Sequence, residues 1–296
     1  MDEIIFNGDI FVGVSGLQLQ QERFEFPLGV VLEGTFAHVM SPVTVAFSPP
    51  IEAGHHHPGP WKAARGGFAQ DVTAQVHIPH SAAAGLGPKL EIANAVGFLL
   101  KLWSDPGITM PVISNLSFSE IRSAPDSHAH IIPFEHRRRS FELRLLDDAG
   151  TVESVTWVVS HFDTTLRLMK ECPEFRLAAT ALHVGQFVEN TALTLISLWG
   201  ALEALFSPST SELRFRVSAL ISAYLYPPGA TRMEQQKRIA SLYDKRSAAA
   251  HGKPKHAAED LVATFTILRE VLIKFIEKGH VPTKQECEER LFGCRE

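Results

Sequence analysis

The first half of the chain has the hydrophobic pattern of strands and turns. Runs rich in Val, Ile, Phe and Thr alternate with Gly and Pro clusters, which is typical of antiparallel strands. One segment differs, because Lys89–Trp103 places apolar residues at helical spacing before Asp105-Pro106-Gly107 ends it. The remaining pattern predicts strands at Ile4–Val12, Gly29–Val39, Val43–Phe47, Val72–Ile78, Ile113–Ile121, His130–Phe134 and Ser140–Leu146.

After Val152 the apolar positions recur every three or four residues, which predicts helices. Phe187–Phe206 is apolar almost all round, so this helix is expected at the centre of a bundle. The helices are expected at residues 152–170, 173–185, 187–206, 212–225, 231–251 and, with the clearest apolar stripe, 261–275, followed by a short one from Thr283. The sequence therefore predicts an α+β protein: a mostly-β sensor or recognition domain of unknown family at residues 1–150 and an all-α domain at residues 151–296.

Composition narrows the environment and the partners. The chain has 296 residues with 45% hydrophobic content, enough for one large core or two ordinary ones. A net charge of -5 excludes a basic coat over the whole surface. Three cysteines far apart support no disulfide framework, and the acidic start lacks the basic region of a signal peptide. The apolar stretch Asn190–Leu202 is shorter than a membrane span. We expect a soluble cytoplasmic protein with no membrane contact.

The segment Leu242–Gly252 carries the candidate chemistry. Arg246 and His251 stand five residues apart at the end of a predicted helix, about 140° apart around its axis. The long arginine side chain can still swing toward a histidine on the last turn. Three alanines lie between the two, so a partner helix or a ligand can approach the backbone closely.

Two sequence blocks in this half resemble a known family. The first is Leu-Trp-Gly-Ala-Leu-Glu-Ala-Leu-Phe at Leu198–Phe206, and the second is Leu242-Tyr243-x-x-Arg246-Ser247-x-x-x-His251-Gly252. Their order and spacing resemble the HEPN superfamily, in particular its Apea-like subgroup, over about residues 175–280. The resemblance implies a helical bundle that forms a homodimer in which two Arg–His motifs face each other. Many HEPN proteins are metal-independent endoribonucleases of prokaryotic antiviral defence, toxin or RNA-processing systems.

The residue types suit RNA cleavage without a metal or a cofactor, and we expect neither. A histidine with a near-neutral pKa can take the proton from a 2′-hydroxyl or give one to the leaving 5′-oxygen, so His251 is the candidate acid or base. A permanently charged, bidentate arginine can clamp the scissile phosphate, and this role falls to Arg246. Ser247 is a candidate hydrogen-bonding auxiliary, and Glu203 is expected to orient Arg246 or Tyr243.

Local charge favours RNA as the partner. From Arg232 to His256 the sequence has seven Lys and Arg residues against two acids, a local charge of +5 within an acidic chain. The candidate RNA-binding residues are Arg238, Lys245, Lys253 and Lys255. The alternative is that these bases only solvate an exposed helix face.

Several other residues have simpler interpretations. His55-His56-His57 is flanked by Gly and Pro, which favours a loop over a metal site, and His77 and His80 around Pro79 favour a turn at a strand end. His136–Arg139 is read as a solvated hairpin tip, with an extension of the RNA path as the alternative. The aromatic residues expected in the core are Trp199, Phe206, Phe265 and Phe275.

Two functions of other classes remain open. One is a non-catalytic HEPN adaptor whose first domain binds a partner; in the nuclease hypothesis that domain would bind an activator or inhibitor. The other is an enzyme that transfers phosphate or nucleotidyl groups with the same Arg–His pair. The chain has no phosphate-binding glycine loop, HExxH or GxSxG motif, which removes the common nucleotide-dependent, zinc-protease and serine-hydrolase classes.

Overall fold

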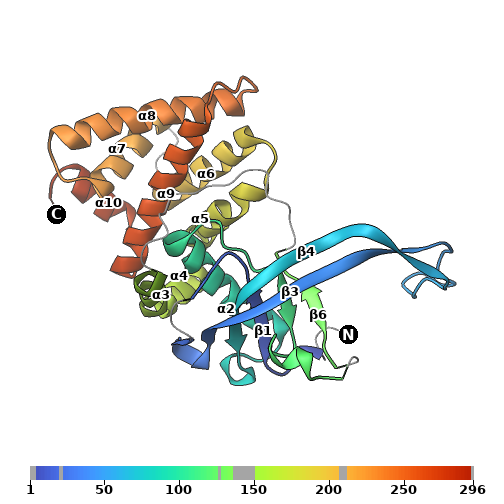
Figure 1. The fold of residues 1–296 in the computed structure, drawn as a ribbon. Helices are drawn as coiled ribbons and strands as arrows, with labels where there is room; N and C mark the ends of the chain where they lie inside the picture. The colour runs from blue at the N-terminus through green and yellow to red at the C-terminus, as the bar shows by residue number, and fades with distance from the viewer. Residues whose placement is uncertain (1–4, 20–22, 126–127, 136–150, 207–211, 295–296) are drawn as a thin grey trace.

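The chain is α+β, as the sequence predicts, with an antiparallel sheet in its first half and helices in its second (Figure 1). The computed structural model describes residues 5–19, 23–125, 128–135, 151–206 and 212–294. The predicted domain boundary near residue 150 and the predicted strand Ser140–Leu146 lie outside the described residues.

Six strands form one sheet in the order β2-β3-β4-β1-β5-β6, and every neighbouring pair is antiparallel. Buried Val and Ile side chains of β1 and β4 contribute to the main core, as expected for strands with one face covered. The strands are β1 (Ile10–Val14), β2 (Arg23–Glu25), β3 (Val31–Ala46), β4 (Trp61–Ile78), β5 (Val112–Ser114) and β6 (Ile131–Pro133).

Three strand predictions were wrong in extent. Gly29–Val39 and Val43–Phe47 belong to one long strand, β3, and β4 begins at Trp61 instead of Val72. The pairing shifts near Ser41, where Gly66 and Gly67 of β4 adopt positive φ angles of 114° and 107°. A glycine pair tolerates this conformation, so the strand bends without ending.

Two further strands are shorter than predicted. β1 begins at Ile10 because the preceding backbone turns around the buried Lys89, whose Nζ donates hydrogen bonds to the carbonyl oxygens of Phe6, Asn7 and Gly8. After β5 the chain leaves the sheet, because Ser117 and Glu120 close a turn in which Glu120 N donates to Ser117 O at 3.0 Å.

The predicted helix ranges lie closer to the observed ones than the predicted strand ranges do. The helix predicted at 152–170 is in fact two, divided at His161, whose ring stacks on Trp157 and whose backbone is not helical. The π-helical turn Leu100–Ser104 extends α2. The helices are α2 (Leu86–Leu99), α3 (Thr151–Ser160), α4 (Phe162–Glu171), α5 (Pro173–Val184), α6 (Thr191–Phe206), α7 (Leu213–Leu225), α8 (Ala230–Ala250), α9 (Ala258–Lys278) and α10 (Lys284–Leu291).

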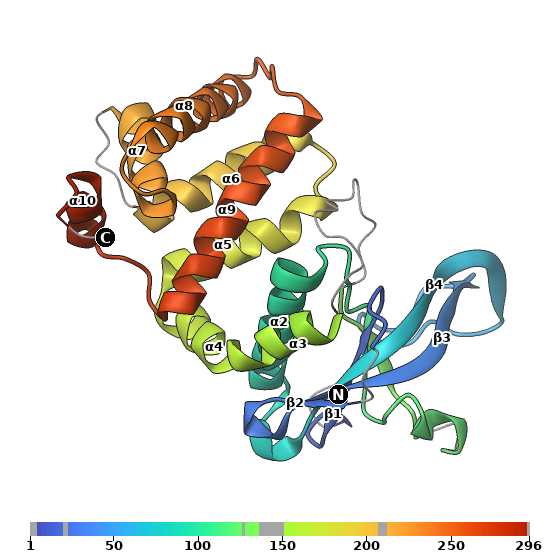
Figure 2. The same ribbon diagram turned by 60° about the vertical axis from the view of Figure 1, so that its left-hand side comes forward.

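One continuous hydrophobic core joins the sheet to the helices. It runs from Val76 of the sheet through Leu99 of α2 to Phe175 and Trp199 of the bundle. Figure 2 shows α2 and α3 between the sheet and the remaining helices. The predicted core aromatics Trp199, Phe206, Phe265 and Phe275 are at most 2% exposed, which confirms their structural role.

A buried charged cluster fixes the same junction. Lys101 Nζ lies 2.6 and 2.7 Å from the two carboxylate oxygens of Glu135, and His183 Nε2 of α5 lies 3.2 Å from Glu135 Oε1. Met110 N donates to Glu135 Oε2 at 2.8 Å. One carboxylate therefore links the end of α2, the strand region after β6 and the bundle.

No helix in the described part of the chain is both long enough and apolar enough to cross a membrane.

Candidate functional site

The predicted motif lies on the last turns of α8, which packs against α6 and α7. The helix ends at Ala250, and His251 N still donates to Ser247 O at 3.1 Å. Gly252 follows with a φ of 71°, the left-handed conformation with which helices commonly end. The sequence therefore places Arg246 inside the helix and His251 at its carboxyl end.

Arg246 faces α6 and is held there. Its Nη2 donates to Glu203 Oε2 at 3.1 Å, and its Cζ lies 5.5 Å from the centre of the Tyr243 ring. Trp199 meets that ring edge-on, with ring centres 5.2 Å apart. Arg246 and Glu203 side chains are only 24% and 21% exposed. Four residues from two helices thus form one packed cluster around the guanidinium.

The cluster has unused polar capacity. Arg246 Nε is buried and has no hydrogen-bond partner among the described residues, which is costly for a donor. Burial raises the pKa of Tyr243, and the neighbouring Glu203 carboxylate raises it further, so the phenol stays protonated and able to donate. Glu203 Oε1 is likewise buried without a partner, so the cluster holds one unpaired donor and one unpaired acceptor in the described part of the chain.

His251 lies apart from this cluster. It is exposed, and within residues 212–294 its side chain makes no hydrogen bond or ion pair with Arg246. The swing of Arg246 toward His251 that the sequence allows is therefore not made here, because Glu203 and Tyr243 hold the guanidinium against α6. Ser247 is partly buried between them. The catalytic and auxiliary roles of all these residues stay predictions.

The basic residues divide into two groups. Lys245, Lys253 and Lys255 lie at or just after the end of α8, and Lys245 Nζ donates to Lys255 O at 3.1 Å. Lys253 and Lys255 are exposed there. Arg232 instead caps other elements, donating to the carbonyl oxygens of Tyr226 and Arg290. The local charge is therefore partly structural.

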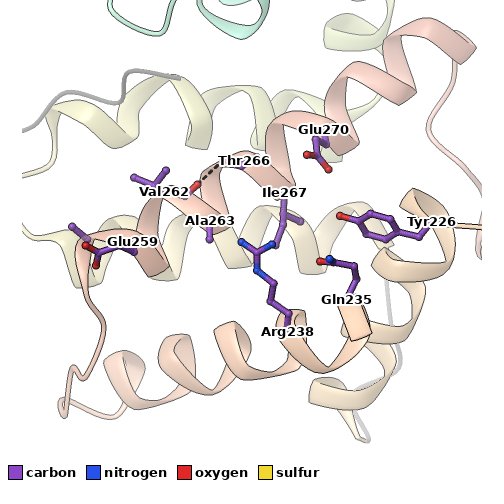
Figure 3. A pocket seen from close by; sticks show the side chains of 10 residues that line it. Tyr226, Gln235, Arg238, Glu259, Val262, Ala263, Thr266, Ile267 and Glu270 are labelled. Atoms are coloured by element: carbon purple, nitrogen blue, oxygen red, sulfur yellow. Dashed lines mark hydrogen bonds between the residues drawn. The ribbon is translucent and has the colours of Figure 1, made fainter. Parts of the chain in front are cut away.

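Arg238 lies further back on α8 and lines a groove of about 380 Å³ between α8 and α9 (Figure 3). Tyr226, Gln235 and Glu270 gather with it at one end of the groove. Burial raises the pKa of Glu270, although nearby Lys and Arg charges oppose the rise. The structure thus separates Arg238 from the lysines at the carboxyl end of the helix.

Sequence reasoning missed His256. Its Nε2 lies 2.9 Å from Thr191 Oγ1, which fastens the α8–α9 turn to the start of α6, and its Nδ1 is buried without a partner in the described part of the chain. Its position five residues after His251 was the available signal. Sequence reasoning also missed that Asp244 holds Arg214 with two hydrogen bonds of 2.6 and 2.8 Å.

The other histidines are structural or exposed. His77 Nε2 lies 2.8 Å from Asp9 Oδ2 and His80 Nδ1 lies 2.7 Å from Asn7 O, which confirms the predicted turn at the end of β4. His55–His57 lie in an exposed loop, and no three His, Cys, Asp or Glu side chains form a metal site in the residues the structure describes. His136–Arg139 falls outside these residues.

Comparison with known proteins adds no relative. No protein-family model, curated protein or solved structure matches this chain. Functional inference therefore rests on the site itself.

The contact between Glu203 and Arg246 can be tested by stability. Glu203→Ala should lower the free energy of unfolding by about 1–2 kcal/mol, because it leaves a mostly buried guanidinium without its carboxylate. Urea unfolding followed by circular dichroism measures the loss. Glu91→Ala, which removes an exposed carboxylate from the middle of α2, should change stability by less than about 0.5 kcal/mol. Equal losses in the two variants would contradict a special role for the contact.

Proposed function

We propose that the chain is a metal-independent endoribonuclease of HEPN type, acting at the interface of a homodimer, in prokaryotic antiviral defence or a toxin system. The observation that carries the proposal is the arrangement at the end of α8. A mostly buried arginine with an unpaired donor and an exposed histidine occupy consecutive turns, and two exposed lysines follow. The resemblance of these residues to the HEPN motif adds to this observation.

The chemistry assigns each residue one task. Cleavage begins when a base removes the proton of the 2′-hydroxyl, so that its oxygen attacks the adjacent phosphorus. It ends when an acid protonates the departing 5′-oxygen. Arg246 would hold the negative charge that builds up on the phosphate oxygens between these events. Lys253 and Lys255 would contact neighbouring phosphates. Ser247, Glu203 and Tyr243 would position the arginine.

A second copy of the chain would supply the second histidine that the reaction needs. The reaction needs both a base and an acid, and the exposed end of α8 offers a single histidine, because His256 is engaged with Thr191. Two copies that meet at this end would bring together two His251 and two Arg246 side chains. The proposal therefore requires a homodimer in which the ends of the two α8 helices converge.

The adaptor hypothesis is favoured by a different observation. Arg246 is already engaged with Glu203 and Tyr243, so the motif can serve as a brace between α6 and α8. In that case the bundle would dimerise without catalysis, and the first half of the chain would bind the partner.

The test uses the purified full chain with single-stranded RNA in excess EDTA. We expect cleavage, with products that end in a 2′,3′-cyclic phosphate, because the 2′-hydroxyl is the nucleophile. An RNA of the same sequence with 2′-deoxy sugars at the cleaved positions should stay intact, since it lacks that nucleophile. Gel electrophoresis and mass spectrometry of the products measure both results.

Four results would reject the proposal. Cleavage that stops in EDTA would indicate a metal-dependent enzyme, and cleavage of the 2′-deoxy RNA would exclude 2′-hydroxyl attack. A dimer that cleaves no RNA, while Arg246→Ala and His251→Ala proteins keep their full biological effect, would favour the adaptor. Preference for mononucleotides over RNA would favour transfer of a phosphate or nucleotidyl group.

A further inference from the structure

A long two-stranded ribbon projects from the body of the protein (Figures 1 and 2). It consists of residues 35–47, which are most of β3 and the residue after it, residues 61–73 of β4, and the loop at residues 48–60 between them. We call this ribbon the arm. β3 pairs with β2 only as far as Glu33, and β4 pairs with β1 only from Ala74 onward. Along the arm, neither outer strand edge pairs with another strand of the described chain.

The arm exposes an unusual amount of apolar surface. Of the fifteen large hydrophobic side chains that are exposed in the described residues, seven lie on the arm: Phe36, Met40, Val43, Val45, Phe47, Ile51 and Trp61. An isolated two-stranded ribbon is marginally stable in water, and open strand edges invite pairing. Exposed apolar surface of this kind marks an interaction site.

The two faces of the arm differ at its base. On one face Ala37, Val39 and Phe68 pack on a small cluster formed by Val72, Val112 and Phe118. On the other face Phe36 and Met40 are 70% and 67% exposed. They flank His38, whose Nδ1 lies 2.7 Å from Asp71 Oδ1 across the ribbon. The protein covers one face itself and leaves the Phe36–Met40 face open.

The charge of the arm argues against a nucleic acid or an anionic membrane as its partner. Residues 35–73 contain two bases, Lys62 and Arg65, and two acids, Glu52 and Asp71, so the arm carries no net charge. A nucleic acid or an anionic membrane would favour an excess of bases. An arm without net charge can also pack on a second copy of this chain, whose net charge is -5, without like-charge repulsion.

Size also fits a second copy. Thirteen residues per strand at about 3.3 Å each give a ribbon about 40 Å long, and a width of about 10 Å gives roughly 400 Å² per face. If each arm packs one face on the body of the other copy, each of the two contacts buries about 400 Å² on the arm and about as much on the body. The dimer then removes about 1,600 Å² from water, the size of a standard stable interface.

The arm extends away from the helical bundle. In both ribbon views it points to the right, whereas α8 turns into α9 at the top of the bundle (Figures 1 and 2). We propose that the arm is a dimerisation element, in which each copy lays the Phe36–Met40 face against a second copy of this chain. The inference stands on the exposed ribbon and is independent of nuclease activity.

The test compares the dimer dissociation constants of the full chain and of the double variant Phe36→Ser, Met40→Ser by analytical ultracentrifugation. We expect a wild-type dimer and a constant raised about 100-fold in the variant, because four exposed apolar side chains per dimer lose their cover. In the wild type, backbone amides of residues 35–47 and 61–73 should exchange more slowly with deuterium as the dimer forms.

The matched control is Ile131→Ser with Phe292→Ser, which removes two exposed apolar side chains outside the arm. It should leave the dimer intact, and circular dichroism should show both double variants folded. A monomeric wild type, an arm variant with an unchanged constant, or a control that dissociates equally would overturn the proposal. Binding of wild-type monomers, but not of the arm variant, to phosphatidylglycerol vesicles would overturn it in favour of a lipid surface.

RNA assays on the same proteins separate this proposal from the proposed function. A wild-type dimer that depends on the arm but cleaves no RNA would retain the arm proposal and reject the nuclease. If the protein cleaves RNA and the arm substitutions leave its dimer dissociation constant unchanged, the nuclease proposal is retained and the arm proposal is rejected.

Discussion

Replacing His251 with alanine is expected to lower the rate of RNA cleavage by about 1,000-fold or more, because each dimer loses both its acid and its base, and each such group contributes about 10² to 10⁴. The side chain is exposed and makes no contact that the fold needs, so stability should be unchanged. Single-turnover cleavage in EDTA measures the rate, and analytical ultracentrifugation confirms that the variant still dimerises.

Arg246 offers a graded comparison on the same helix. Arg246→Ala should lower the cleavage rate by about 100 to 1,000-fold through lost charge stabilisation. Arg246→Lys keeps the charge but not the two-pronged contact with phosphate, so it should recover only part of the rate. A lysine variant as inactive as the alanine variant would favour a purely geometric role.

Lys253→Ala is the matched control for both variants. It removes an exposed base next to the site and should weaken RNA binding evenly across sequences. It should also reduce the salt dependence of binding by about one phosphate contact, while the rate at saturating RNA stays near that of the wild type. Full activity of the His251→Ala dimer would exclude the histidine as acid or base, and equal losses in Lys253→Ala would mean that charge alone explains the effect.

The helices were predicted well because their signals are local. The stripe from Leu261 to Phe275 and the stops at Gly252 and Gly279 act within a few residues, and the structure places α8 and α9 close to the expected ranges. The division at His161 was missed because it depends on Trp157 and Trp103, and Trp103 lies far away in the sequence.

The arm was missed because its pairing is non-local. Trp61–Phe68 is rich in Ala and Gly and has no strand alternation of its own. It becomes a strand because it pairs with β3. The paired residues lie too far apart in the sequence for a short window to include both. Strand predictions from single segments therefore failed where one strand depends on the other.

Only part of the candidate site was predicted, because contacts between helices, like the pairing of β3 and β4, join residues that lie far apart in the sequence. The spacing of Arg246 and His251 located the motif, and the resemblance suggested Glu203 as a neighbour of Arg246. The contact at 3.1 Å depends on how α6 and α8 cross, as does the contact between His256 and Thr191. Sequence spacing on one helix identifies residues that share a turn, whereas contacts between helices require the fold.

The buried Glu135 carboxylate is expected to contribute strongly to the free energy of unfolding. Burial alone would raise the pKa of Glu135, but the hydrogen bond with His183 and the charges of Lys101 and His183 outweigh it and lower the pKa to about 2. A carboxyl whose pKa is lowered by folding stabilises the folded state above its unfolded pKa of about 4.3 and loses that contribution as the pH falls toward 2. Glu135→Gln should therefore cost about 3 kcal/mol at pH 7, measured by urea unfolding.

The same pair of proteins gives the pH dependence. Below about pH 4.5 the wild type should lose the contribution of Glu135 while the glutamine variant has none to lose, so the difference in free energy of unfolding narrows with falling pH. Asp244→Ala breaks the exposed ion pair with Arg214 and should cost at most about 1 kcal/mol, because solvent screens that pair. A constant difference between wild type and Glu135→Gln from pH 7 down to pH 2.5 would show that the carboxylate charge does not stabilise the junction between the sheet and the bundle.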